Sequence, residues 1–216
     1  MLTIYRQLLD QYGRQHWWPA ETPFEVMVGA VLTQNTAWTN VEKAIDNLKA
    51  DGRLALDSML SMSQQALADA IRPAGYFNVK AKRLLSLCRF LERNPGLERL
   101  DSGLLRSRLL SVHGVGPETA DDILLYAFNR PVFVVDAYTR RLFSRLGVIE
   151  PDIGYERLRQ GFEQALGRDV RLFNEYHALI VAHGKSICRP RALCRECVLE
   201  RHCLHACASP DISPDR

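Results

Sequence analysis

Apolar residues recur every three or four positions along most of the chain, which is the spacing of one face of an α-helix. Two clear runs are Phe24, Met27, Val28, Val31 and Leu32, and then Val41, Ala44, Ile45 and Leu48. Glycines and prolines separate such stretches, as expected where helices end. The pattern predicts a mostly helical protein.

One short segment departs from this pattern. Val132-Phe133-Val134-Val135 lies between Pro131 and Asp136, and its β-branched and aromatic residues favour a strand. The run is short, and no second segment offers to pair with it. We therefore expect a buried extended connector rather than part of a sheet.

Composition sets broad limits on the function. A chain of 216 residues with 47% hydrophobic residues suits one large domain or two small ones with a proper core. No basic flank with a long apolar segment opens the chain, and no later stretch would span a membrane. We expect a cytoplasmic protein with no membrane partner. The net charge of +3 permits a nucleic-acid partner without requiring one.

Four cysteines near the end of the chain form the pattern C-x5-C-x2-C-x5-C. They are Cys188, Cys194, Cys197 and Cys203. Thiolates are soft ligands that select iron–sulfur clusters or zinc, so we predict one metal cluster that ties down the C-terminal segment. A structural zinc site is an alternative; two disulfides are a weaker one, because the chain has no secretory signal.

A glycine-containing turn, Gly114-Val115-Gly116, separates two apolar-periodic segments. This arrangement predicts a helix-hairpin-helix. The glycines permit backbone angles that aim successive N–H groups outward, beside a helix start where Pro117 suits the first turn. Such a nest grips a phosphate without reading sequence. The alternative is an ordinary tight turn.

The hairpin, the segment Val134–Arg141 and the cysteine pattern together resemble the endonuclease III superfamily of base-excision DNA glycosylases. The resemblance spans nearly the whole chain. Further matching segments are Pro23-Phe24-Glu25, Leu32-Thr33-Gln34-Asn35-Thr36 and the stretch from Ile71 to Lys82.

The resemblance implies an all-α fold of two lobes with a cleft between them. One lobe, residues 21–133, is a six-helix barrel with the hairpin; the other, residues 1–20 and 134–207, carries a [4Fe–4S] cluster. A damaged nucleotide of double-stranded DNA is flipped into the cleft. We expect a monomer associated with the nucleoid, and a disordered tail at residues 208–216.

The resemblance also assigns two acidic residues to the chemistry. Asp136 becomes the carboxylate that stabilises positive charge on the sugar and orients water; its alternative role is the N-cap of a helix from Tyr138 to Leu146. Glu118 occupies the position where members that also cut the backbone carry a lysine. A carboxylate cannot form a Schiff base, so a monofunctional enzyme is predicted. The alternative for Glu118 is an exposed acid at a helix start.

Aromatic residues provide the indication of the base that is removed. The chain resembles the subgroup of the bacterial 3-methyladenine DNA glycosylase III type in its tryptophans, which are Trp17, Trp18 and Trp38. Alkylation gives a purine a positive charge that attracts it to electron-rich rings, and two indoles could sandwich it. Tryptophans that belong to the core are the alternative.

Other residues are DNA-contact candidates by the same resemblance. Gln34 and Tyr76 would fill the gap left by a flipped base, unless they are buried loop residues. The hairpin residues Gly114, Val115 and Gly116 would hold one phosphate. Basic residues around the cysteines would reach others, or are simply solvated charges. These basic residues are Lys185, Arg189, Arg191 and Arg195.

Three functions from different classes follow. The leading one is a DNA glycosylase that removes alkylated purines. The second is an endonuclease III-like glycosylase and lyase for oxidised pyrimidines or mismatched thymine, against which Glu118 argues. The third is a non-catalytic DNA-binding iron–sulfur protein, against which Asp136 argues.

Overall fold

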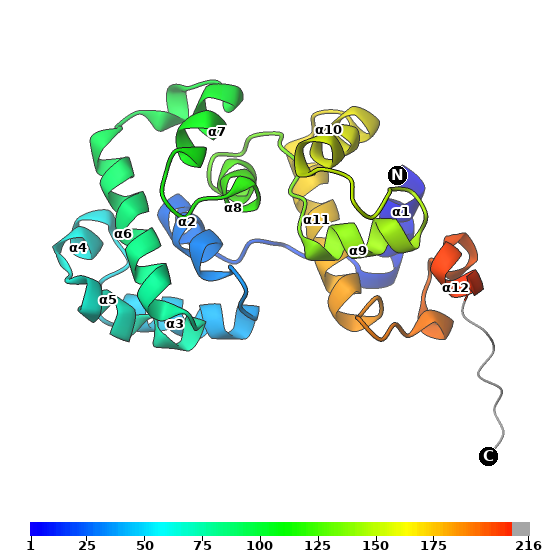
Figure 1. Cartoon of the computed structure of the whole chain (residues 1–216), viewed down its shortest axis with the longest axis horizontal. Coiled ribbons are helices and arrows are strands. Elements are labelled where there is room, and N and C mark those ends of the chain that lie inside the picture. Colours follow the sequence, from blue (N-terminus) through cyan, green and yellow to red (C-terminus); the bar gives the residue numbers. More distant parts are fainter. Residues whose placement is uncertain (209–216) are drawn as a thin grey trace, which may run out of the picture. The chain divides into compact units, whose positions relative to one another are not determined.

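A computed structural model describes residues 1–208 of the chain (Figure 1). Its regular elements in this range are all helices, and no strand occurs there. The predicted all-α class is therefore confirmed. Within the same range, no helix is both long and apolar enough to cross a membrane.

The chain folds into two compact units. The first contains Met1–Trp17 together with the chain from Pro131 onward, and the second contains Trp18–Arg130. The boundaries expected from the sequence were 21 and 133. Of the tail expected at residues 208–216, Ala208 ends the last helix, and residues 209–216 lie outside the described part of the chain.

The unit Trp18–Arg130 contains seven α-helices, two 3-10 turns and a π-helix. The α-helices are α2 (Pro23–Leu32), α3 (Trp38–Ala50), α4 (Leu56–Ser61), α5 (Gln64–Ala70), α6 (Phe77–Arg93), α7 (Ser102–Leu110) and α8 (Pro117–Asp122). The 3-10 turns are η1 (Arg72–Ala74) and η2 (Leu97–Arg99), and the π-helix is η3 (Ile123–Ala127).

Helix α2 lies at the centre of this unit. Thr22 caps its start by accepting from the Glu25 amide at 3.1 Å, and Pro23 occupies the first turn. Every residue from Glu25 to Leu32 is buried, because α2 packs against α3, α6, α8 and η3. Buried Glu25 forms an ion pair with Lys49 at 2.9 Å, which compensates its charge.

The other unit joins the two ends of the chain. Its helices are α1 (Leu2–Tyr12), α9 (Ala137–Arg145), α10 (Tyr155–Leu166), α11 (Val170–Ser186) and α12 (Leu204–Ala208), with 3-10 turns η4 (Cys194–Glu196) and η5 (Glu200–His202). Helix α11 packs against α1 and α9. The Tyr176 hydroxyl donates to the Met1 carbonyl oxygen at 2.9 Å, so the chain start is tied to the middle of α11.

The core of this unit is aromatic. Phe133 stacks on Phe162 with ring centroids 4.2 Å apart, and Phe143 meets Phe162 edge to face. The residues Val132–Val135 are extended, unpaired and buried. The expected buried connector is confirmed, and it delivers the chain to Asp136.

Candidate active site and DNA-contacting loops

Asp136 starts α9 directly after the buried connector. Its Oδ1 accepts a hydrogen bond from the Thr139 amide at 2.7 Å, so the predicted N-cap is present. Its Oδ2 lies 3.6 Å from Nε2 of His177 on α11. The side chain is only 12% exposed. Oδ1 is thus fixed by the first turn of α9, and Oδ2 faces the His177 ring of α11.

The surroundings of Asp136 determine its charge. Burial by itself would raise the pKa of this carboxyl, but the His177 ring and the Thr139 amide outweigh burial and hold the pKa below its usual range. The start of α9 also favours an anion. Asp136 is therefore ionised at neutral pH and suited to stabilising positive charge rather than to donating a proton.

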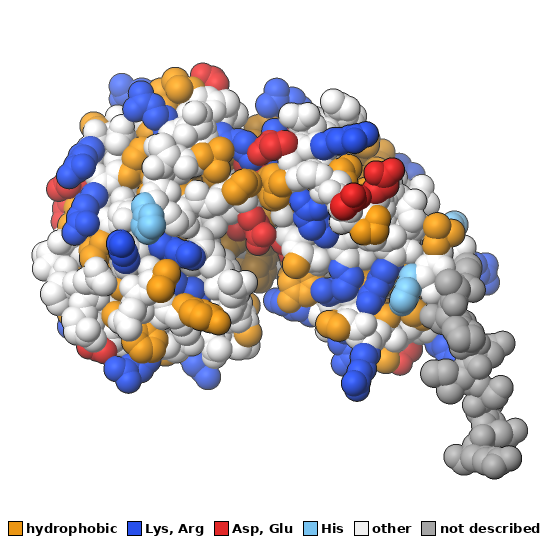
Figure 2. Space-filling model, in the orientation of Figure 1, with side chains coloured by type: hydrophobic (Ala, Val, Ile, Leu, Met, Phe, Trp, Pro, Cys, Tyr) orange, Lys and Arg blue, Asp and Glu red, His pale blue; other side chains and the backbone are white. Residues whose placement is uncertain are grey.

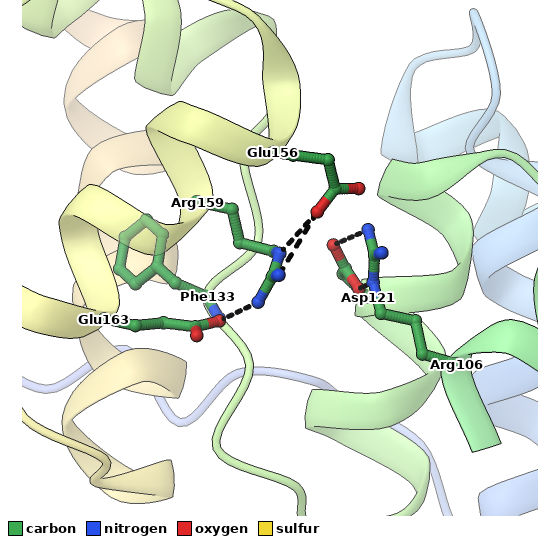
Figure 3. Close-up of polar contacts among 6 residues, drawn as sticks. All are labelled: Arg106, Asp121, Phe133, Glu156, Arg159 and Glu163. Carbon is green, nitrogen blue, oxygen red and sulfur yellow. Dashed lines mark hydrogen bonds and ion pairs between the residues drawn. The ribbon is translucent and has the colours of Figure 1, made fainter. Parts of the chain in front are cut away.

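The connector before Asp136 is fixed by a charged network on α10 (Figure 3). Oε1 of Glu163 accepts from the Phe133 amide at 3.1 Å and from Nη1 of Arg159 at 2.6 Å. The same guanidinium donates to Glu156 Oε2 at 3.2 Å. Glu163 thereby accepts the hydrogen bond of the Phe133 N–H, which a neighbouring strand would accept in a sheet.

The helix-hairpin-helix consists of α7, a turn and α8. Gly114 has φ 89°, and a Cβ there would overlap Arg83 Cγ, so glycine is required for both reasons. A Cβ at Gly116 would meet nothing within 4 Å. Within residues 1–208, the amides of Gly114 and Gly116 make no hydrogen bond. The amide between them differs, because the Val115 N–H donates to the Val112 carbonyl oxygen at 3.0 Å. The turn therefore offers the Gly114 and Gly116 N–H groups, but not three successive ones, to a phosphate.

A buried ion pair connects the two helices of the hairpin (Figure 3). Arg106 of α7 donates through Nε to Asp121 Oδ1 at 2.6 Å and through Nη2 to Oδ2 at 3.1 Å. The Asp121 side chain is fully buried and that of Arg106 is 14% exposed. Two parallel bonds fix both the distance and the orientation of α7 and α8.

Glu118 lies in the first turn of α8 and is exposed. It follows Gly116-Pro117 directly, at the position that the resemblance assigns to a lysine in bifunctional enzymes. An acid in the first turn is favourable next to the helix dipole.

Gln34 is tied to the hairpin. Its Nε2 donates to the Gly114 carbonyl oxygen at 3.0 Å and to Thr119 Oγ1 at 2.9 Å, while its Oε1 accepts from Arg83. Its amide is therefore engaged on both sides, and in this structure Gln34 supports the hairpin turn. Its role in filling the gap left by a flipped base stays a prediction.

Tyr76 has a different environment. Its side chain is 73% exposed, and its φ of 44° is left-handed, which is uncommon for a bulky residue. It precedes α6, directly after Gly75. An exposed ring on a constrained backbone is the arrangement that a wedge requires.

Two of the predicted pocket tryptophans contact each other. Trp18 meets Trp38 edge to face, with centroids 5.2 Å apart and planes at 89°. On another side, Trp18 lies 5.1 Å from the ring of Tyr126 in η3. Trp38 Nε1 donates to Glu42 Oε1 at 2.8 Å. Trp18 also rests on α2, where a Cβ at Gly29 would lie 3.0 Å from its ring.

A base held between two indoles needs parallel rings with space between them. Trp18 and Trp38 do not supply that arrangement with each other, because their rings are perpendicular and in contact. The role of the tryptophans in a base pocket stays a prediction. Trp17 belongs to the other unit, where Lys185 Nζ lies 5.9 Å from the centre of its ring.

The four cysteines of the C-terminal segment line one small pocket. Its other walls include Leu142, Leu146 and Leu199. The four thiols form no disulfide in the described part of the chain. Within residues 1–208, no three Cys, His, Asp or Glu side chains converge closely enough for a single metal ion.

Helices α9 and α11 supply hydrogen bonds around this pocket. Arg145 donates to Cys188 Sγ at 3.4 Å and to the Arg189 carbonyl oxygen at 2.7 Å. His183 is fully buried, with Nδ1 2.8 Å from the Tyr12 hydroxyl and Nε2 3.6 Å from Cys197 Sγ. Burial lowers the pKa of His183 to about 4, so its ring is neutral at pH 7.

The predicted basic residues of this segment are exposed. They are Lys185, Arg189, Arg191 and Arg195. Figure 2 shows Lys and Arg side chains spread over the visible face of each unit rather than gathered in one patch.

Comparison with known proteins decides the family. Residues 28–168 match the family model of the HhH-GPD superfamily of base excision DNA repair proteins. The chain belongs to this superfamily. The glycosylase is 52% identical over 207 residues to a protein of Methanocaldococcus jannaschii provisionally named a DNA repair glycosylase, covering 93% of this chain and 94% of the relative.

Further relatives agree with this assignment. The glycosylase is 31% identical to endonuclease III of Thermotoga maritima, over 93% of this chain and 90% of the relative. Among solved structures, it is similar to 3-methyladenine DNA glycosylase (MagIII) of H. pylori bound to 1,N6-ethenoadenine, with a TM-score of 0.75 and 31% identity over 85% of this chain and 96% of that one. An endonuclease III–DNA complex, with TM-score 0.82 and 20% identity over 95% and 94%, shares the fold.

Sequence reasoning missed several residues of this DNA glycosylase. Tyr126, Glu42 and His177 complete the surroundings of Trp18, Trp38 and Asp136. Glu42 had a usable signal, because it follows Trp38 by one helical turn. Tyr126 and His177 had none, because their partners are distant in the sequence.

Proposed function

We propose that this DNA glycosylase is a monofunctional, monomeric enzyme that removes alkylated purines such as 3-methyladenine from double-stranded DNA. The observation that carries the proposal is the aromatic group of Trp18, Trp38 and Tyr126 with the carboxylate of Glu42 beside it. Electron-rich ring faces and a nearby negative charge attract a cationic base more strongly than a neutral one.

The state of Asp136 supports the same substrate class. In the reaction, water adds to C1′ of the sugar, the bond from C1′ to the base nitrogen breaks, and its electron pair stays with the base. A cationic alkylpurine leaves as a neutral molecule without first receiving a proton. An ionised Asp136 can stabilise the sugar cation and accept the proton of the attacking water, but it cannot protonate a neutral leaving group.

Glu118 supports the monofunctional assignment. A lyase step requires an amine that forms a Schiff base with the opened sugar, and Glu118 stands at the position where the resemblance places that amine. The product would therefore be an intact abasic strand. The similarity to the H. pylori enzyme with bound 1,N6-ethenoadenine adds support for a modified purine as substrate.

Tyr76 is our candidate for the side chain that fills the gap in the duplex. It is exposed, aromatic and held in one backbone conformation, so stacking would offset part of the cost of unstacking. Gln34 would act on the same gap while its amide keeps the hydrogen bond to the Gly114 carbonyl oxygen. The hairpin amides and the exposed Lys185, Arg189 and Arg191 would hold phosphates.

We also propose that Cys188, Cys194, Cys197 and Cys203 hold a [4Fe–4S] cluster. The donor set is four free thiols around one pocket. Soft thiolate donors suit an iron–sulfur cluster, and zinc is the alternative with the same donor set. When bound, the cluster would cross-link the segment that carries the basic residues. Iron, sulfide and zinc analysis of the purified protein tests this assignment.

The function is tested with DNA methylated by an alkylating agent. Released bases are separated by chromatography, and strand breaks are counted with and without alkali. We expect free 3-methyladenine, and breaks only after alkali. Release of none of the alkylated bases would refute the substrate class, and breaks without alkali would refute the monofunctional assignment.

Two matched variants test the role of Asp136. Asp136→Asn keeps an N-cap oxygen but removes the charge, and should lower excision by about 100-fold or more. Asp169→Asn makes the same change at the start of α11, where Asp169 accepts from the amides of Arg171 and Leu172, and should leave excision unchanged. Equal activity of the two variants would refute the mechanism.

A further inference from the structure

Lys80 is a buried cation in the interior of the unit Trp18–Arg130. Its side chain is only 1% exposed, although lysine is rarely buried without a partner of opposite charge. Among the described residues no carboxylate pairs with it. Burial lowers its pKa to about 8, with a further contribution from Arg83. Burying an ammonium group costs free energy unless hydrogen bonds compensate for the lost water.

The three hydrogen bonds of the ammonium group supply that compensation. Nζ donates to the carbonyl oxygens of Leu32 and Ala74 at 2.8 and 2.7 Å, and to Thr36 Oγ1 at 2.6 Å. Leu32 ends α2 and Ala74 ends η1. The last carbonyls of a helix lack intrahelical partners and carry partial negative charge, so a cation satisfies both at once.

These acceptors belong to two separate loops. One loop runs from Leu32 to Thr36 and contains Gln34; the other runs from Ala74 to Tyr76. Thr36 joins them directly, because its hydroxyl accepts from Lys80 and donates to the Ala74 carbonyl oxygen at 2.5 Å. One ammonium group therefore sets the position of both loops relative to each other.

Both loops contain a residue in the left-handed region. Asn35 has φ 52° and Tyr76 has φ 44°. Asparagine adopts such angles comparatively easily, whereas a bulky tyrosine holds them only where the surroundings enforce them. Lys80 bonds to the backbone within three residues of Asn35 and within two of Tyr76, and together with Thr36 it connects the two loops.

We propose that Lys80 is the positioning residue that presets the Gln34 and Tyr76 loops for insertion into DNA. This inference rests on the proposed role of Tyr76 in filling the gap left by a flipped base. A loop that is already ordered loses less conformational entropy when it binds, so more of the stacking gain is available to hold the base outside the helix.

The first test examines the loops without DNA. Lys80→Met keeps the length of the side chain and removes all three donors, while Lys82→Met removes a charge from an exposed position of the same helix and serves as the control. Hydrogen–deuterium exchange of the peptides covering residues 33–36 and 72–76 should be about tenfold faster or more in Lys80→Met and unchanged in Lys82→Met. Unchanged exchange in Lys80→Met would overturn the proposal.

The second test uses DNA with no base to remove, so that it does not depend on the identity of the substrate. A duplex carries a tetrahydrofuran abasic analogue opposite 2-aminopurine, whose fluorescence reports filling of the gap. Wild type and Lys82→Met should change this fluorescence; Lys80→Met and Tyr76→Ala should not at the same concentration. Normal gap filling by Lys80→Met, with its loops exchanging faster, would also overturn the proposal.

Two outcomes are kept distinct by this design. If wild type itself fails to fill the gap, the proposed role of Tyr76 is wrong, even when the exchange data show that Lys80 orders the loops. If Lys80→Met does not fold, Thr36→Val replaces it, because this variant removes the bridging hydroxyl and leaves the lysine in place. Faster exchange in both loops is again expected, and unchanged exchange again overturns the proposal.

Discussion

The ion pair between Arg106 and Asp121 should be a principal support of the hairpin. Asp121→Asn preserves the shape of the side chain but removes the charge that faces the Arg106 guanidinium from a fully buried carboxylate. Removing one partner of a buried pair typically costs about 3–5 kcal/mol. The matched control is Asp69→Asn, the same substitution in the same unit, where the ion pair with Arg72 is largely exposed and is expected to contribute little to stability.

Tryptophan fluorescence during urea unfolding provides the assay, because Trp18 and Trp38 both lie in this unit. A double-mutant cycle with Arg106→Met separates the pair from the other contacts of the two side chains, and we expect a coupling of about 2 kcal/mol or more. Hairpin binding to DNA should weaken in parallel. The reasoning is refuted if Asp121→Asn and Asp69→Asn lower the free energy of unfolding equally.

Three further predictions concern the other parts of the site. Gly29→Ala places a methyl group 3.0 Å from the Trp18 ring and should lower excision by about tenfold, or ~1.4 kcal/mol, with unchanged helicity by circular dichroism. His183→Phe removes the imidazole beside Cys197 and should speed iron loss to a chelator, followed by visible absorbance; equal rates would contradict this role. Because the Asp136 pKa is lowered on folding, its contribution to stability is full above the unfolded carboxyl pKa of about 3.9 and is lost as pH falls through the lower folded value. Acid unfolding of Asp136→Asn should therefore depend less steeply on pH than that of wild type.

Local signals in the sequence were sufficient for most of the fold. Helical periodicity, the Gly114-Val115-Gly116 turn and the Asp136 N-cap all depend on residues a few positions apart. Such interactions depend mainly on neighbouring residues rather than on the rest of the fold, and the structure contains each of them. The connector at Val132–Val135 was predictable because a strand needs a partner and the sequence offered none.

The roles of individual side chains were less accessible. The sequence offered Gln34 as a residue that acts on DNA, but it did not reveal that its amide bonds to the hairpin and to Arg83. It offered three tryptophans for a base pocket, but not that Trp18 and Trp38 meet at right angles. Ring orientation depends on packing against distant elements, here Gly29 and Tyr126, which no periodicity encodes.

By itself the sequence determined the all-α class, the hairpin and the identities of the acidic and cysteine residues, because helix formation, capping and ligand chemistry are properties of residue type and short spacing. Only the tertiary structure decided that Lys80 connects two loops, that His177 faces Asp136 and that four cysteines surround one pocket. These contacts join residues brought together by burial of apolar surface, and their cost and benefit depend on that burial.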